Sequence, residues 1–158
     1  MKKILILLVC LINSIIASYA QDTELTKEEL KFRDAIELFL LEEGFSPTVD
    51  KEDNSLNFKK EGEDYWINVY GSSPTYIELH KTGFKMEDIN RSNIMEACNK
   101  ATFETRCAKA YIGLSGIDFS VEAYCYSVND FTSIFYRAIS AIDLVKKKTK
   151  NYYTELDK

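Results

Sequence analysis

Short alternating segments dominate the middle of the chain. Residues 55–60, 65–70 and 75–80 place an apolar side chain at every second position, and Gly, Asn, Asp and Pro separate these segments. A β-strand points successive side chains to opposite faces, so a period of two predicts strands that are buried on one face only. Short turns join such strands in antiparallel order. The middle of the chain is therefore expected to form an antiparallel meander, with a further short strand at 45–49.

Helical periodicity surrounds the meander. Thr26 and Glu29 have the spacing of a capping box, and Gly44 stands where a left-handed C-terminal cap belongs, which predicts a helix over 27–43. The other predicted elements are a helix over 88–101, strands near 103–112 and 117–126, and a last helix that opens at Asn129 or Asp130 and closes at lysines 146, 147, 148 and 150.

Each predicted helix has one apolar stripe, and each predicted strand has one apolar face. An antiparallel sheet with all helices packed on one face buries both kinds of surface. The chain is therefore predicted to be an α+β protein with the order α-β-β-β-α-β-β-α and a sheet of about five or six strands.

The N-terminus has the features of a cleavable signal peptide. Residues 1–20 contain two lysines, an apolar run over 4–16 and the small residues Ser18 and Ala20 at the expected cleavage point. The run is too short and interrupted for a permanent anchor, and Cys10 does not fit a lipoprotein signal. Residues 21–158 are thus expected to be a single exported domain, periplasmic or secreted, that meets a membrane only before cleavage.

Charge and cysteine content restrict the partners. Cleavage would leave 18 basic and 25 acidic residues, a net charge of −7, which argues against nucleic acid or an anionic membrane surface as partner. Cys98, Cys107 and Cys125 are an odd number without Cys-x-x-Cys spacing. They are interpreted as small buried apolar residues rather than as a redox site, although export would permit a disulfide.

No catalytic or metal-binding constellation is found. His80 is the only histidine, at the end of a strand, and is interpreted as an exposed or rim residue. The acidic turn near 50–61 approximates an EF-hand spacing, but Ser55 replaces the required glycine. We therefore expect no cofactor and no metal.

A family resemblance rests on several segments: Gly44-Phe45, Leu56-x-Phe58 before Glu61-Gly62, the strand 65–70, Lys109-Ala110-Tyr111-Ile112, and the aromatic-led last helix. Over roughly 27–148, their order resembles a YbjN-type domain, a group similar in fold to type III secretion chaperones. The resemblance implies a non-enzymatic binding or chaperone-like module that can dimerise. The predicted export signal departs from that group and argues against a cytoplasmic secretion-chaperone role.

The face of the sheet opposite the helices is the candidate binding surface. If the apolar strand residues face inward, alternation sends Asn68, Glu78, Glu122 and a set of large rings outward. Such rings are enriched where proteins bind one another, although tyrosine also has a high strand propensity of its own. The predicted partner-binding residues are Trp66, Tyr70, Tyr76, Tyr111, Tyr124 and Tyr126.

These observations lead to a hypothesis and an alternative from another class. The chain is expected to be an exported non-enzymatic module that binds a protein or peptide through the open sheet face, as a monomer or a homodimer. The alternative is an exported hydrolase whose acidic catalytic residues are dispersed in the sequence.

Overall fold

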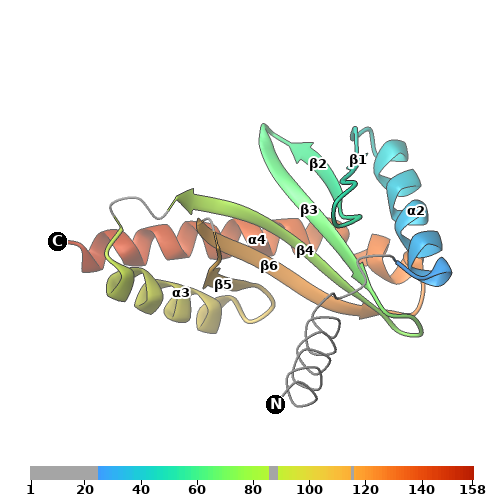
Figure 1. Cartoon of the computed structure of the whole chain (residues 1–158). Helices are drawn as coiled ribbons and strands as arrows, with labels where there is room; N and C mark the ends of the chain where they lie inside the picture. The colour runs from blue at the N-terminus through green and yellow to red at the C-terminus, as the bar shows by residue number, and fades with distance from the viewer. Residues whose placement is uncertain (1–24, 86–88, 115) are drawn as a thin grey trace, which may run out of the picture.

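The computed structural model describes residues 25–85, 89–114 and 116–158. These residues form three helices and one six-stranded antiparallel sheet (Figure 1), as the sequence predicted. The predicted signal peptide, residues 1–20, lies outside the described part of the chain. Among the described helices, none is both long enough and apolar enough to cross a membrane.

The sheet has the spatial order β1-β2-β3-β4-β6-β5. The first four strands are neighbours in sequence order, which confirms the predicted meander, and the β5–β6 hairpin adds β6 beside β4. The strands are β1 (Thr48–Val49), β2 (Leu56–Lys60), β3 (Glu63–Tyr70), β4 (Thr75–Lys85), β5 (Lys109–Ile112) and β6 (Gly116–Cys125).

Helix α2 (Lys27–Glu42) begins and ends as its sequence predicts. The Thr26 hydroxyl accepts the Glu29 N–H, and the Glu29 carboxylate accepts the Thr26 N–H, which completes the capping box. Gly44 has a φ of +86°, and the Phe45 N–H beyond it donates to a carbonyl of the last helical turn. Glycine adopts this left-handed conformation without the steric cost that other residues incur.

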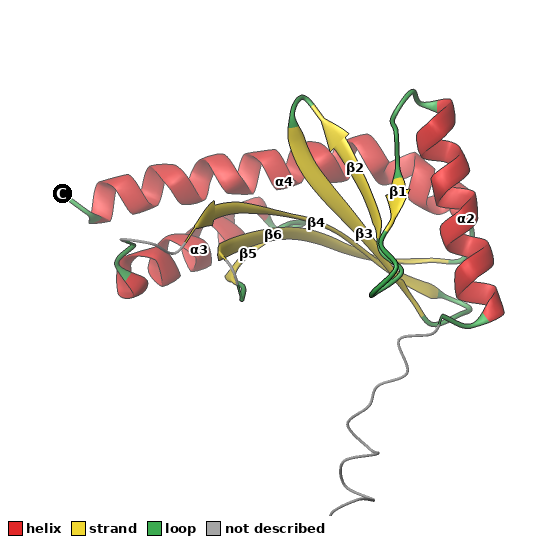
Figure 2. Ribbon diagram, turned by 45° about the horizontal axis from the view of Figure 1, so that its top comes forward, coloured by secondary structure: helices red, strands yellow, loops and turns green. Residues whose placement is uncertain are grey.

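The helices gather on one side of the sheet (Figure 2). Helix α4 (Val128–Leu156) runs along the inner face, which is the face defined by its contact with this helix. Helix α3 (Arg91–Thr105) packs on α4 and lies along β5, whereas α2 packs at the other end of the sheet.

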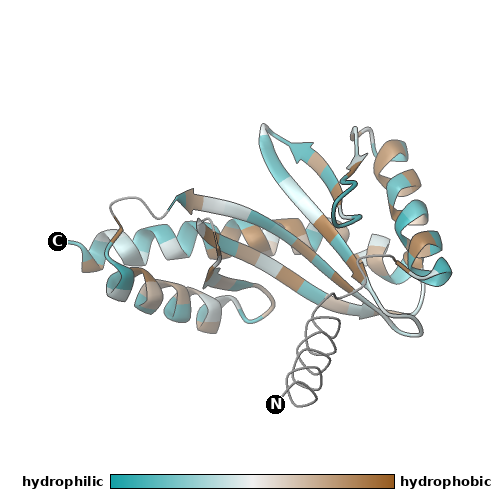
Figure 3. Ribbon diagram, in the orientation of Figure 1, coloured by the Kyte–Doolittle hydropathy of each residue, from teal (hydrophilic) through white to brown (hydrophobic). Residues whose placement is uncertain are grey.

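Apolar side chains fill the space between the sheet and the helices. Hydropathy alternates along β3, β4 and β6 (Figure 3), as expected for strands with one buried face. Phe58 and Phe135 lie with ring centroids 5.8 Å apart and join β2 to α4. The largest apolar residues of this core include Phe58, Ile67, Ile77, Leu79, Phe119, Phe131 and Phe135.

Two boundaries in the second half of the chain differ from the prediction. Helix α3 continues to Thr105, past its predicted end and into the segment expected to be a strand. Thr105 is buried, and its hydroxyl donates to the Ala101 carbonyl, so this polar group is hydrogen-bonded within the last helical turn. Strand β5 therefore begins only at Lys109.

The last helix is longer at both ends than predicted. Its N-cap is Ser127 rather than Asn129 or Asp130, because the Asp130 carboxylate accepts the Ser127 N–H. It continues to Leu156, so the four lysines between 146 and 150 lie within the helix and do not close it.

The described cysteines are all free thiols. Cys98 and Cys125 are buried, as predicted. Cys107 is exposed, so the prediction that all three are buried was wrong for this residue. Cys107 lies in the short connection between α3 and β5, where few side chains can cover it.

Candidate binding face

The outer face of the sheet is the face turned away from α4. On β3, β4 and β6 the alternation is as predicted: Ile67, Ile77 and Phe119 are buried on the inner face, whereas Tyr70 and Tyr124 are exposed on the outer one. Within the described part of the chain, no helix packs across the outer face (Figure 2).

Three tyrosines cross the sheet in one line, which we call the tyrosine row. Tyr70 pairs with Tyr76 between β3 and β4, and Tyr76 pairs with Tyr124 between β4 and β6. Their ring centroids are 6.0 and 5.3 Å apart, within the range of interacting aromatic pairs. Tyr124 is 70% exposed and Tyr70 is 48% exposed. The row is thus a continuous aromatic surface that solvent can reach.

A second line, the carboxylate row, lies two residues along each strand from the tyrosines. Asn68 pairs with Glu78, and Glu78 pairs with Glu122. The Asn68 amide donates to Glu78 over 3.2 Å, and Lys109 of β5 forms an ion pair with Glu122. Two like charges that face each other on neighbouring strands are unfavourable, and these donors reduce that cost.

Trp66 and His80 form the next pair on the same face. Their rings stack with centroids 5.7 Å apart and an interplanar angle of 29°. His80 is half-buried, and its Nε2 lies 3.3 Å from the Asn68 amide. The rim position predicted for His80 is therefore replaced by a stacked position on the face itself.

Tyr111 and Tyr126 occupy the margins of the face. The Tyr111 hydroxyl reaches from β5 to Glu78 over 3.4 Å. Tyr126 follows the end of β6 and is 80% exposed. Among the described residues, neither the Tyr126 ring nor the Tyr111 ring pairs with another aromatic ring of the face. Four of the six predicted residues, Trp66, Tyr70, Tyr76 and Tyr124, therefore lie in ring pairs, and Tyr111 is joined to them only through Glu78.

The carboxylates influence the tyrosines electrostatically. Burial raises the pKa of Tyr76, and the hydrogen bond to Glu122 raises it further. Burial raises the pKa of Tyr70, and the charge of Glu78 raises it further. Burial, followed by the charges of Glu78 and Asp118, raises the pKa of Tyr111 to about 12. The phenols are therefore neutral at physiological pH and lie in a negative potential.

Glu122 remains ionised within this group. Burial alone would raise its pKa, but hydrogen bonds from Lys109 and Tyr76 hold the pKa below its ordinary value. The outer face consequently combines neutral aromatic rings with a negative charge.

A shallow hollow lies where the outer face meets α3. Glu78, Glu122 and Tyr111 line it from the sheet, and Asn99 and Thr102 line it from the helix. The Thr102 hydroxyl accepts the Ala110 N–H over 2.9 Å, so α3 covers part of the β5 edge. An edge strand covered in this way is less available for pairing with another strand.

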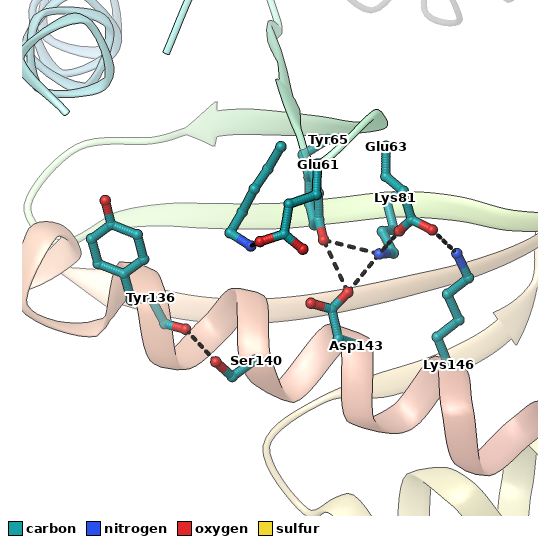
Figure 4. A network of polar contacts seen from close by, with 9 residues as sticks. Glu61, Glu63, Tyr65, Lys81, Tyr136, Ser140, Asp143 and Lys146 are labelled. Carbon is teal, nitrogen blue, oxygen red and sulfur yellow. Dashed lines mark hydrogen bonds and ion pairs between the residues drawn. The ribbon is translucent and has the colours of Figure 1, made fainter. Parts of the chain in front are cut away.

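A polar cluster that no sequence pattern predicted lies on the opposite, inner face (Figure 4). Lys81 continues the inward alternation of Ile77 and Leu79 on β4 and is only 1% exposed. Its ammonium group donates to Glu63, to the Tyr65 hydroxyl over 2.9 Å and to Asp143 of α4 over 2.6 Å. The alternation itself was the available signal, because it places position 81 inside.

All three donor positions of the Lys81 ammonium are satisfied. Burial lowers the pKa of Lys81, but hydrogen bonds to Asp143, Glu63 and Tyr65 outweigh burial and raise it overall. Glu63 also accepts from Lys146 of α4, and its pKa is lowered, chiefly by that hydrogen bond and by the one from Lys81. A lysine with a raised pKa is protonated at neutral pH and is a poor nucleophile. Its contacts link the sheet to α4.

The acidic turns are stabilised by their own side chains. The Asp50 carboxylate accepts the Glu52 N–H over 2.7 Å, and the Asp53 carboxylate accepts the Ser55 N–H over 2.9 Å. The described residues contain no group of three or more His, Cys, Asp or Glu side chains that could hold a metal ion. These acids therefore act as turn-forming residues here.

Comparison with solved structures identifies a fold relative. The chain is similar to the crystal structure of YbjN from E. coli, described as a candidate transcription regulator, with a TM-score of 0.56 and 10% sequence identity. The match covers 76% of this chain and 92% of YbjN. It confirms the predicted YbjN-like fold and, at this identity, nothing finer. No protein-family model and no curated protein sequence matches the chain.

Proposed function

We propose that the protein is an exported, non-enzymatic module that binds a protein or peptide on the outer face of its sheet. The observation that carries the proposal is the tyrosine row, which is continuous across three strands and remains uncovered by the described helices. Tyrosine supplies a large contact area at a small cost in side-chain entropy, together with a hydroxyl for hydrogen bonding.

The geometry also supports a fixed rather than an adaptable surface. Tyr70, Tyr76 and Tyr124 are each held by a strand in the middle of the sheet, and the Trp66–His80 stack lies on the same strands. A binding surface that is ordered before contact loses less conformational entropy on association.

A protein partner fits this surface better than nucleic acid. YbjN is described as a candidate transcription regulator, but a nucleic-acid backbone requires clustered Lys and Arg. Here Glu78 and Glu122 lie at the centre of the outer face, and only Lys109 among the residues of the carboxylate row and its donors is cationic. The net charge of −7 proposed for the exported domain acts in the same direction.

A hydrolase that works with a pair of carboxyl groups, as a glycosidase does, requires one of them to be protonated near neutral pH. Glu63 and Glu122 each lie beside a second carboxylate, Asp143 and Glu78 respectively. Both have a pKa held below the ordinary value, so neither is suited to donate a proton. Binding is therefore the function we propose.

The test compares two double variants of the exported protein. Trp66→Ala with Tyr124→Ala removes rings from the outer face, whereas Phe103→Ala with Leu144→Ala removes exposed apolar groups from α3 and α4. Partner capture from periplasmic extract and self-association in the ultracentrifuge are measured for each variant, and circular dichroism checks the fold.

The outer-face variant is expected to lose its partner, or its dimer, while the helix-face variant keeps it. If the outer-face variant stays folded and associates as the unchanged protein does, the proposed function is wrong.

A further inference from the structure

Glu78 and Glu122 are direct neighbours across β4 and β6, at the centre of the outer face. Side chains in such a cross-strand pair have Cβ atoms about 4.5–5.5 Å apart, and like charges at that distance destabilise the sheet. A protein that keeps two carboxylates in this position retains a local negative charge that a cation would neutralise.

The two carboxylates differ in how they are compensated. Glu122 forms an ion pair with Lys109 and accepts from Tyr76. Within the part of the chain that the structure describes, the donors to Glu78 are neutral, the Asn68 amide at 3.2 Å and the Tyr111 hydroxyl at 3.4 Å. Among the described residues, no Lys or Arg forms an ion pair with Glu78. Its charge is thus available to a cation from outside.

Aromatic rings lie close to the Glu78 carboxylate. Tyr76 and Tyr124 are adjacent in the tyrosine row, and Tyr111 reaches Glu78 from β5. The face of an aromatic ring attracts a cation, most often a guanidinium group. A guanidinium is planar and can stack on a ring while it donates in parallel to a carboxylate.

We propose that the outer face binds an arginine-bearing segment of another protein, with the guanidinium group between the tyrosine row and Glu78. This inference rests on the proposed function and names the chemistry of its partner. A hollow beside α3, lined by Glu78, Glu122, Tyr111 and also the cation Lys109, adjoins this position on the side away from the tyrosine row.

Charge complementarity selects this occupant over a second copy of the chain. Two outer faces brought together about a two-fold axis through the centre of the face would place Glu78 and Glu122 of each copy near the same pair of the other. Like charges that oppose each other across an interface cost several kcal/mol. An arginine-bearing segment instead supplies the charge that the surface lacks.

The test uses the single tryptophan as a reporter. Trp66 is the only tryptophan of the chain and lies on the outer face, so its fluorescence reports binding there. The probes are a short peptide of alternating Gly and Arg, and the same peptide with neutral citrulline at every Arg. The arginine peptide is expected to bind at least about tenfold more tightly than the citrulline peptide.

Two variants locate the interaction. Glu78→Gln with Glu122→Gln removes both central charges, and it is expected to weaken arginine-peptide binding about tenfold or more. Glu42→Gln with Glu155→Gln changes the net charge equally at two exposed helix positions and is expected to bind as the unchanged protein does. Equal weakening in both variants would show that binding depends only on the net charge of the protein, and this would overturn the proposal.

Lys109 allows a test in which a substitution is expected to strengthen binding. If it competes with the incoming guanidinium for the carboxylate row, Lys109→Gln tightens arginine-peptide binding, whereas Lys51→Gln in an exposed turn does not. Equal affinity for the arginine and citrulline peptides overturns the arginine preference and leaves the proposed binding face standing. A dimer that forms through the outer face and excludes the peptide likewise overturns it. The alanine variants of the outer face test the proposed function separately.

Discussion

The Nζ atom of Lys81 lies 2.6 Å from Oδ1 of Asp143, and this contact joins a buried position of β4 to helix α4. The Tyr65 hydroxyl donates to the same carboxylate oxygen over 2.9 Å. A buried cation is tolerated only when charged and polar partners replace its water. Asp143 therefore helps to hold α4 against the sheet.

Removal of Asp143 should be costly. Asp143→Ala is expected to lower the free energy of unfolding by about 2 kcal/mol, less than the roughly 3–5 kcal/mol for a wholly buried pair, because Glu63 and Tyr65 still contact Lys81. Urea denaturation measures the change. Asp64→Ala breaks the exposed pair with Lys59 and should cost less than about 1 kcal/mol. Equal losses in the two variants would contradict the role assigned to the buried contact.

Acid should weaken the same cluster through Glu63. Its pKa is held below the ordinary value of 4.5, chiefly by hydrogen bonds from Lys146 and Lys81. A carboxylate with a lowered pKa in the folded state adds stability above its unfolded pKa and loses it as pH falls through the folded pKa. The stability advantage of the unchanged protein over Glu63→Gln should therefore shrink below about pH 4.5. Urea midpoints across this range measure it, and an advantage independent of pH would contradict it.

High pH should lower the stability of the folded protein through Tyr65. Burial raises its pKa from 10.0 to about 12, opposed by Lys81 and aided by Asp143. Because the folded state holds this proton more tightly than the unfolded state, the associated stability is complete below pH 10 and is lost as pH rises toward 12. The stability difference between the unchanged protein and Tyr65→Phe should shrink over that interval. Ultraviolet titration of tyrosinate in both proteins should show one fewer late-titrating phenol in Tyr65→Phe than in the unchanged protein, in which Tyr76 and Tyr111 also titrate late.

Thiol labelling should separate the three described cysteines. Cys107 is exposed, whereas Cys98 is buried and burial raises its pKa to about 11. Because the thiolate is the reactive form, brief treatment of the folded protein with iodoacetamide should modify Cys107 first. Peptide mass spectrometry identifies the site, and Cys107→Ser is the control. Equal modification of Cys98 under native conditions would show that the core around α3 opens more readily than its packing implies.

The sequence by itself predicted the fold class and which side chains of each strand face the core. Alternation in β3 and β4, the capping box before α2 and the glycine after it depend on neighbours within a few residues. The same local pattern placed Trp66, Tyr70 and Tyr76 outward. Element ends were less predictable, because the length of α4 depends on contacts with α3 and with the sheet rather than on its own periodicity.

Only the tertiary structure decided which of these residues meet. Strand pairing brought Tyr76 beside Tyr124 and Glu78 beside Glu122, and register of this kind depends on elements far apart in the chain. Alternation directs Lys81 inward, but its partner Asp143 lies 62 residues later, so the sequence alone does not show what its ammonium group contacts. Local periodicity determines the direction of a side chain, whereas long-range packing determines its partners.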